Sequence, residues 1–171
     1  MQIYELMITQ PRKMLRNLDQ WLEKAIEHGK TRDFDAEVLL HSRLVPDMYS
    51  LTRQIQAACD QAKIPAARLA GTTPPVHPDP ETTLAELRAR IQAVVDYLGT
   101  YEPKDFDGAE DRIIELKFRQ PMVVRGADYV VELAQPNFYF HVTMAYALLR
   151  HNGVVLGKRD FIGSTSAKPA V

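Results

Sequence analysis

The sequence predicts an all-α fold, a four-helix bundle with a small β-hairpin inserted between helices three and four. Long stretches of the chain place apolar residues three and four positions apart, the spacing that lines one side of a helix. A change to β-branched residues around positions 113–124 favours a hairpin. The chain has 171 residues, 46% hydrophobic and 25% charged, which suits a single domain with a sizeable buried core.

The first long helix is expected from Pro11 to His28. Proline suits the first turn of a helix, because the N–H that it lacks would have no intrahelical partner there, and Gly29 suits a C-terminal cap. The apolar stripe of this segment consists of Met14, Leu15, Leu18, Trp21, Leu22, Ala25 and Ile26.

A short helical turn and a second long helix are expected next. Asp35 can cap a turn that runs through Leu40, because its carboxylate accepts a hydrogen bond from a free backbone N–H. Pro46 lacks an N–H and predicts a bend or a fresh start near Val45. The stripe that defines this helix consists of Leu44, Met48, Leu51, Ile55, Cys59 and Ala62.

A proline-rich connection separates the second helix from the third. Residues 72–80 contain four prolines and cannot propagate a helix or a central strand, and His77 within them is expected to be solvated. Thr83 and Glu86 then have the spacing of a capping box, in which each side chain bonds the free backbone N–H of the other residue. The third helix is therefore expected to begin there and to end at Gly99.

The hairpin and the fourth helix follow. One strand is expected at Ile113–Phe118 and its partner at Met122–Val124, joined by a turn at Gln120–Pro121. Residues 128–134 suit one or two helical turns, after which Pro136 opens the fourth long helix, which runs to about His151. We assign residues 1–163 to the bundle domain and expect residues 164–171 to form a disordered tail.

Charge and composition exclude several classes of function. Twenty-one Lys and Arg residues nearly balance 22 Asp and Glu residues, without the basic block that tracks phosphates, so nucleic acid is not expected as a partner. No apolar stretch is long enough to span a membrane, and the segment 1–6 lacks the pattern of a secretion signal. The lone Cys59 occupies an apolar helix position, which indicates a buried, inert thiol. A cytoplasmic location is expected.

The most unusual residues lie at the start of the fourth helix. Asn137 and His141 are four positions apart, so their side chains face the same way on a helix. They form half of a metal site, or Asn137 caps the helix while His141 is a hydrogen-bonded core histidine. His41 could approach His141 across the bundle, with Arg43 and Asp47 close by in sequence, and the five residues are the candidates for a polar pocket. The alternative is an exposed histidine beside a surface arginine.

Three consecutive aromatic residues, at 138–140, cannot all share one helix face. At least one ring must point away from the local core, toward the hairpin, a pocket or a partner chain. This pattern motivates the expectation of a homodimer.

Four runs of sequence resemble a bacterial domain-of-unknown-function family within the DinB/YfiT-like superfamily of helical bundles. These runs are RLVPDM at 43–48, QPNFYFH at 135–141, AYALLRHNGV at 145–154 and GKRDFIG at 157–163. The resemblance covers nearly the whole chain and implies a DinB-like four-helix bundle and frequent homodimers. In the wider superfamily one histidine of the second helix and an H-x-x-x-H pair of the fourth helix hold a metal. The resemblance puts His141 at the second position of that pair, Asn137 at the first, and His41 near the remaining ligand.

Two hypotheses follow. In the first, the chain is a metal-free or weakly metal-binding relative that binds a small ligand or simply dimerises. In the alternative, His41, Asn137 and His141 hold a divalent metal, Zn, Ni or Mn, and the protein is an enzyme that acts on a small, thiol-bearing molecule. Asn137 departs from the superfamily pattern, and an amide oxygen is a weaker ligand than imidazole.

Overall fold

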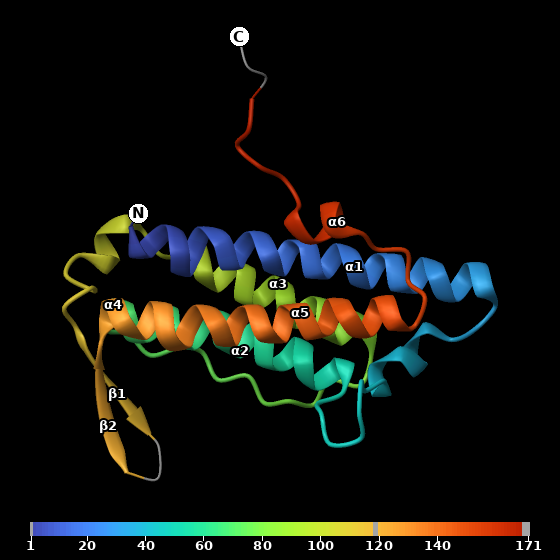
Figure 1. Cartoon of the computed structure of the whole chain (residues 1–171), viewed down its shortest axis with the longest axis horizontal. Coiled ribbons are helices and arrows are strands. Elements are labelled where there is room, and N and C mark those ends of the chain that lie inside the picture. Colours follow the sequence, from blue (N-terminus) through green and yellow to red (C-terminus); the bar gives the residue numbers. More distant parts are fainter. Residues whose placement is uncertain (1, 118–119, 169–171) are drawn as a thin grey trace.

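The computed structural model describes residues 2–117 and 120–168 and confirms the expected architecture (Figure 1). Four long helices lie side by side: α1 (Gln10–Arg32), α2 (Leu51–Ala70), α3 (Leu84–Leu98) and α5 (Gln135–His151). The helix α2 packs on both α3 and α5, and α1 covers α3 and α5 from the other side. A two-stranded hairpin projects at one end of the bundle. Within the described residues, no helix is both long enough and apolar enough to cross a membrane.

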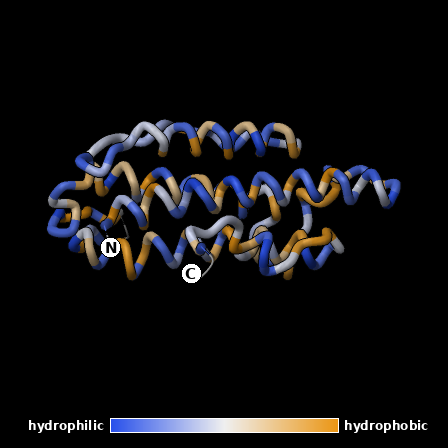
Figure 2. Tube along the Cα trace, turned by 90° about the horizontal axis from the view of Figure 1, so that it is seen from above, coloured by the Kyte–Doolittle hydropathy of each residue, from blue (hydrophilic) through white to orange (hydrophobic). Residues whose placement is uncertain are grey.

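One continuous core fills the bundle. Hydrophobic and hydrophilic residues alternate turn by turn along the long helices, as Figure 2 shows. Burying the apolar residues removes them from water, which supplies the main driving force for folding. The largest fully buried side chains include Met7, Ile8, Leu15, Leu18, Trp21, Leu22, Leu40, Leu51, Ile55, Leu69, Leu84 and Phe138.

The first helix is longer than predicted at both ends. A π-helical turn, Glu5–Thr9, precedes α1 without a break, and α1 continues through Gly29 to Arg32. Asp33 adopts the left-handed conformation with φ 56° and provides the C-cap in place of Gly29. Gly29 is needed for a different reason: a Cβ there would lie 2.8 Å from the carbonyl oxygen of Phe34, where the chain turns back across the helix.

The second helix begins later than the apolar stripe suggested. The short helical turn is confirmed as a 3-10 helix, Ala36–His41, with Asp35 Oδ1 accepting a hydrogen bond from the Glu37 N–H at 3.0 Å. Residues 42–50 then form a loop. The helix α2 begins after Ser50, whose side chain caps it by accepting a hydrogen bond from the Arg53 N–H. Leu44 and Met48 therefore lie outside α2, whereas Pro65 lies inside it.

The linker and the third helix form as predicted. Residues 71–83 contain no helix or strand. Thr83 Oγ1 accepts from the Glu86 N–H at 3.2 Å, and Glu86 Oε2 accepts from the Thr83 N–H at 3.0 Å, which confirms the capping box. Gly99 is the C-cap of α3.

The hairpin pairs β1 (Ile113–Lys117) with β2 (Pro121–Arg125) in antiparallel register, with Ile114 opposite Val124 and Leu116 opposite Met122. The predicted strand residue Phe118 lies outside the described residues. After β2 the chain is helical without interruption through α4 (Gly126–Tyr129), a π-helical turn (Val130–Ala134) and α5. Pro136 therefore does not open the helix, and Asn137 does not cap it, because both follow residues that are already helical.

A short C-terminal helix, α6 (Lys158–Ile162), was missed by the sequence analysis. It is held on α1 by Trp21, whose Nε1 donates to the carbonyl oxygen of Asp160 at 3.1 Å. The Phe161 ring stacks on the same indole with centroids 5.6 Å apart. This helix has only five residues, which is too few for a periodic pattern to reveal it. Residues 164–168 form no helix or strand, and the disorder of the tail stays a prediction.

Candidate functional site

His141 lies on α5 and faces α2, where it forms a buried polar pair with Gln54. The histidine is 9% exposed and Gln54 is 1% exposed, and His141 Nδ1 lies 2.8 Å from Gln54 Oε1. An amide oxygen can only accept a hydrogen bond, so Nδ1 carries the proton and Nε2 holds the lone pair. The pair fixes both the orientation and the tautomer of the imidazole.

Aromatic rings and a positive charge surround this imidazole. The Tyr49 ring, from the loop before α2, stacks on it with centroids 6.3 Å apart, and Phe140 meets it edge-on at 5.3 Å. The Arg53 guanidinium lies 5.7 Å from the Tyr49 centroid. Burial, and then the positive charge of Arg53, lower the pKa of His141 below its ordinary value of 6.5. The imidazole is therefore neutral at pH 7.

Asn137 also lies on the part of α5 that faces α2, but it has different neighbours. Its side chain is exposed and lines a cavity of about 180 Å³ between α2 and the helical segment 126–151. The other polar residues of this cavity are Gln61, Arg68 and Tyr129. The sequence predicted that residues 137 and 141 face the same way. In the structure His141 bonds Gln54, whereas Asn137 lines a cavity beside the same helix.

The remaining predicted residues lie on the surface. His41, Arg43 and Asp47 are all exposed, and no hydrogen bond, ion pair or ring contact joins any of them to His141 in the described chain. Next to His41, Ser42 Oγ lies 3.3 Å from Asn152 Oδ1. Asn152 follows the end of α5, eleven residues from His141, which is about 16 Å along a helix. His141 therefore contacts Gln54 of α2 and Tyr49 of the preceding loop, and not His41.

The described side chains near His141 do not form the ligand set that a divalent metal needs. Three protein ligands with imidazole, carboxylate or thiolate donors are typical of catalytic zinc sites. Among residues 2–117 and 120–168, no three His, Cys, Asp or Glu side chains come together in that way. His141 offers one nitrogen, Asn137 offers an amide oxygen in a cavity that His141 does not line, and His41 is exposed at the end of its 3-10 helix. These residues as arranged do not fit a tightly held metal, and binding of Zn, Ni or Mn stays a prediction.

A second buried polar group, which sequence reasoning missed, joins α2, α3 and the proline-rich linker. Its centre is Arg90, whose side chain is 2% exposed. The guanidinium bonds Asp60 at 2.9 Å, Asp79 at 2.8 Å and Glu81 at 3.1 Å. Lys63 bonds Asp60 at 3.0 Å. We call these five residues the linker network. The position of Arg90, three residues after Leu87 and next to Ile91 on the apolar stripe of α3, was the signal that could have revealed it.

His77 is attached to the linker network and is not solvated as expected. Its Nδ1 lies 2.6 Å from Lys63 Nζ, and the histidine is half-buried. Burial, together with the positive charges of Lys63 and Arg90, lowers the pKa of His77. The neutral ring can then accept a hydrogen bond from the ammonium group. Cys59, next to Asp60, is fully buried, and this burial raises its pKa to about 12, as expected of an inert thiol.

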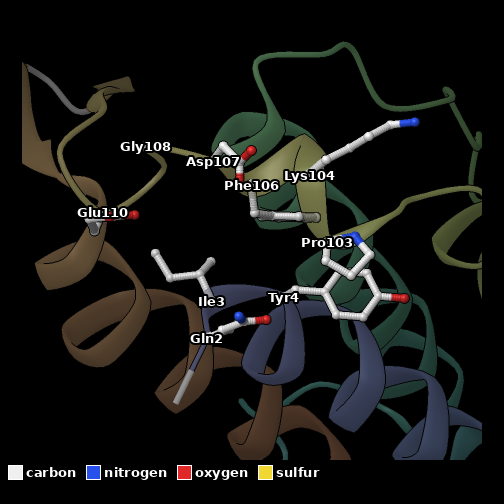
Figure 3. Close-up of a pocket in the computed structure, with 9 residues that line it drawn as sticks. All are labelled: Gln2, Ile3, Tyr4, Pro103, Lys104, Phe106, Asp107, Gly108 and Glu110. Atoms are coloured by element: carbon white, nitrogen blue, oxygen red, sulfur yellow. The ribbon is translucent and has the colours of Figure 1, made fainter.

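A larger cavity, of about 650 Å³, lies at the end of the bundle between residues 2–4 and 103–110 (Figure 3). Its walls include the rings of Tyr4 and Phe106, whose centroids are 5.9 Å apart. Lys104 points away from the hollow and pairs with Glu102 at 2.6 Å. The remaining charged side chains of this cavity, Asp107 and Glu110, are both acidic.

Comparison with known structures places the chain among DinB-like bundles. A crystal structure of a DinB family member protein from Shewanella denitrificans matches with a TM-score of 0.95 and 44% sequence identity, over 98% of this chain and 96% of that chain. The chain belongs to the family described as Domain of unknown function (DUF1993), which matches residues 3–162. Both findings confirm the resemblance inferred from the sequence. No curated protein matches the chain.

Proposed function

We propose that this protein is a DinB-like bundle that binds a small ligand on its α2–α5 side without a divalent metal. The observation that supports this most directly is that, among the described residues, His141 belongs to no group of three His, Cys, Asp or Glu side chains that could hold a metal ion. The imidazole has a neutral amide as its buried partner, and its aromatic neighbours Tyr49 and Phe140 are not metal ligands. In this proposal Nε2 of His141 acts as a hydrogen-bond acceptor.

A small ligand is favoured because polar side chains of this side have unused hydrogen-bonding capacity next to a cavity. Asn137, Gln61 and Arg68 line the cavity together with apolar side chains. Polar groups that converge beside apolar side chains are a feature of small-molecule sites, and this cavity has four polar and three apolar lining residues.

Elemental analysis tests the metal-free part of the proposal. Protein purified without an affinity tag is incubated with zinc, nickel or manganese and passed through a desalting column. We expect well below one metal ion per chain for both the parent protein and His141→Ala. The matched positive control is Asn137→His, which restores the H-x-x-x-H spacing and should retain more zinc than the parent. A stoichiometric metal in the parent that is lost in His141→Ala would contradict the proposal and favour the metal-dependent enzyme.

A homodimer remains part of the proposal, supported by apolar side chains exposed around His141. Tyr49 and Phe140 are each 49% exposed. The two rings contact the imidazole directly, so they form one surface with it. Burying such a patch against a second copy removes it from water. Light scattering on the same samples measures the mass, and a 19.4 kDa species at micromolar concentration would exclude the dimer.

A further inference from the structure

The cavity beside Asn137 combines one cation with several neutral polar groups. Arg68 comes from α2, Tyr129 from α4, and Asn137 from α5. Gln61, two helical turns before Arg68, lies on the same side of α2. The apolar part of the wall consists of Leu116, Leu133 and Ala134. No acidic side chain lines this cavity in the described part of the chain.

Arg68 differs from the half-buried Arg88 and the buried Arg90 in its partners. Its Nη1 donates to the Tyr129 hydroxyl at 3.1 Å, and its guanidinium carbon lies 6.0 Å from the centroid of the same ring. Arg88 and Arg90 each bind at least two carboxylates, whereas no carboxylate lies within ion-pair distance of Arg68 across the described residues. A guanidinium has five N–H donors in a planar fork that matches a carboxylate. Most of these donors remain available to a ligand.

The two amides add further donors to the same wall. Neither Gln61 nor Asn137 makes a side-chain hydrogen bond to another described residue, and each carries an NH₂ group. A negatively charged oxygen in the cavity could thus accept from the guanidinium and from an amide together. Charge-assisted hydrogen bonds of this kind are about twice as strong as neutral ones.

The volume limits the ligand to a small molecule. About 180 Å³ is close to the engineered cavity of about 150 Å³ that holds benzene. We propose that the Arg68 cavity binds a small organic monocarboxylate, with the carboxylate on Arg68 and Asn137 and the apolar end on Leu116 and Leu133. This inference rests on the proposed function, because it names the class of ligand that the α2–α5 side takes.

Titration with sodium benzoate, followed by ¹H–¹⁵N NMR of the full chain, tests the inference. Benzyl alcohol serves as the neutral probe of nearly the same shape. Benzoate should shift the backbone amides of the non-proline residues in 61–68 and 129–137, and benzyl alcohol should bind at least tenfold more weakly. In Arg68→Gln the dissociation constant for benzoate should rise at least tenfold. The matched control is Arg16→Gln, the same change at an exposed arginine of α1, which should leave the constant unchanged.

The outcomes separate this inference from the proposed function. Equal binding of both probes, or an unchanged dissociation constant in Arg68→Gln, would overturn the inference that the ligand is a carboxylate. The proposal that the bundle binds a small ligand would still stand. No shift in these amides at about 10 mM benzoate would also overturn it. If Arg68→Gln fails to fold, Arg68→Lys replaces it, since it keeps the charge but loses the planar fork and should weaken benzoate binding severalfold. A metal held by His141 would refute the metal-free function, but it would not change the effect of Arg68→Gln on the dissociation constant for benzoate.

Discussion

The helix α2 carries two polar faces that differ in how fully their groups are paired. Gln54, Gln61 and Arg68 are spaced seven apart and face α5, whereas Asp60 and Lys63 lie about half a turn around the helix and face the linker. In the linker network each charged side chain meets an opposite charge. On the α5 face one amide is paired with His141, while the guanidinium lacks a carboxylate partner in the described residues. The paired face serves to stabilise the fold, and the incompletely paired face has capacity for a ligand.

The largest effect should come from breaking the paired face. Replacing Arg90 by Met removes the buried guanidinium that three carboxylates share, while Asp60 keeps its ion pair with Lys63. This loss should lower the free energy of unfolding by about 3 kcal/mol in urea denaturation. The control is Arg88→Met on the same helix, where the arginine is 33% exposed and pairs with Asp19 and Glu23. That change should cost at most about 1 kcal/mol. Equal losses for the two variants would mean that the linker network contributes no more than a surface ion pair.

An intermediate effect is expected from the amide that is paired on the other face. Gln54→Leu removes the acceptor of His141 Nδ1 and leaves a buried N–H unsatisfied, so we expect a loss of about 1–2 kcal/mol. Gln61→Leu is the matched control, because it is the same change on the same face two turns later. It should stay within about 0.5 kcal/mol of the parent. If calorimetry or urea denaturation gives both variants the same stability, the Gln54 hydrogen bond does not distinguish these two positions.

The smallest effect concerns pH. The folded-state pKa values of His141 and His77 lie below 6.5, in both cases chiefly because of burial. The unfolded chain therefore binds more protons, and the free energy of unfolding should decrease as the pH falls below 6.5. Above that value this contribution to stability is fully present. His141→Gln and His77→Gln should each flatten the dependence measured between pH 7.5 and 5, with exposed His41→Gln as the control. A parent stability that rises on acidification over this range would contradict the two shifts.

The sequence predicted the helices where local chemistry decided their limits. The Thr83–Glu86 capping box fixed the start of α3, and Asp35 fixed the 3-10 helix, because both signals depend on residues within one turn. The predicted end of α1 was wrong because Gly29 is not the cap of the helix. Gly29 allows the backbone of Phe34 to lie close to the helix, which only the folded chain reveals. The predicted start of α2 was wrong because two apolar residues of the preceding loop, Leu44 and Met48, have the spacing of the helical stripe.

The candidate site was predictable only in part. Helical spacing predicted that Asn137 and His141 face the same way. In the structure His141 bonds Gln54 of α2, and Asn137 lines a cavity beside that helix. Their partners depend on the register between α2 and α5, which a single sequence does not provide. The heptad spacing of Gln54, Gln61 and Arg68 was a usable signal, since three polar residues on one face of an otherwise buried helix require partners. The partners of Arg90 come from the irregular linker, where no periodicity exists to guide a prediction.

Two helices of this bundle carry a π-helical turn just before a proline. The turn Glu5–Thr9 contains Met7, four residues before Pro11, and the turn Val130–Ala134 contains Glu132, four residues before Pro136. Those are the carbonyls that a proline ring would crowd in a regular helix. A π-helical turn also holds one residue more than an α-helical turn. Relatives that lack either proline should therefore align with a single-residue gap at that point, and each gap would record a local insertion that was absorbed without unfolding the helix.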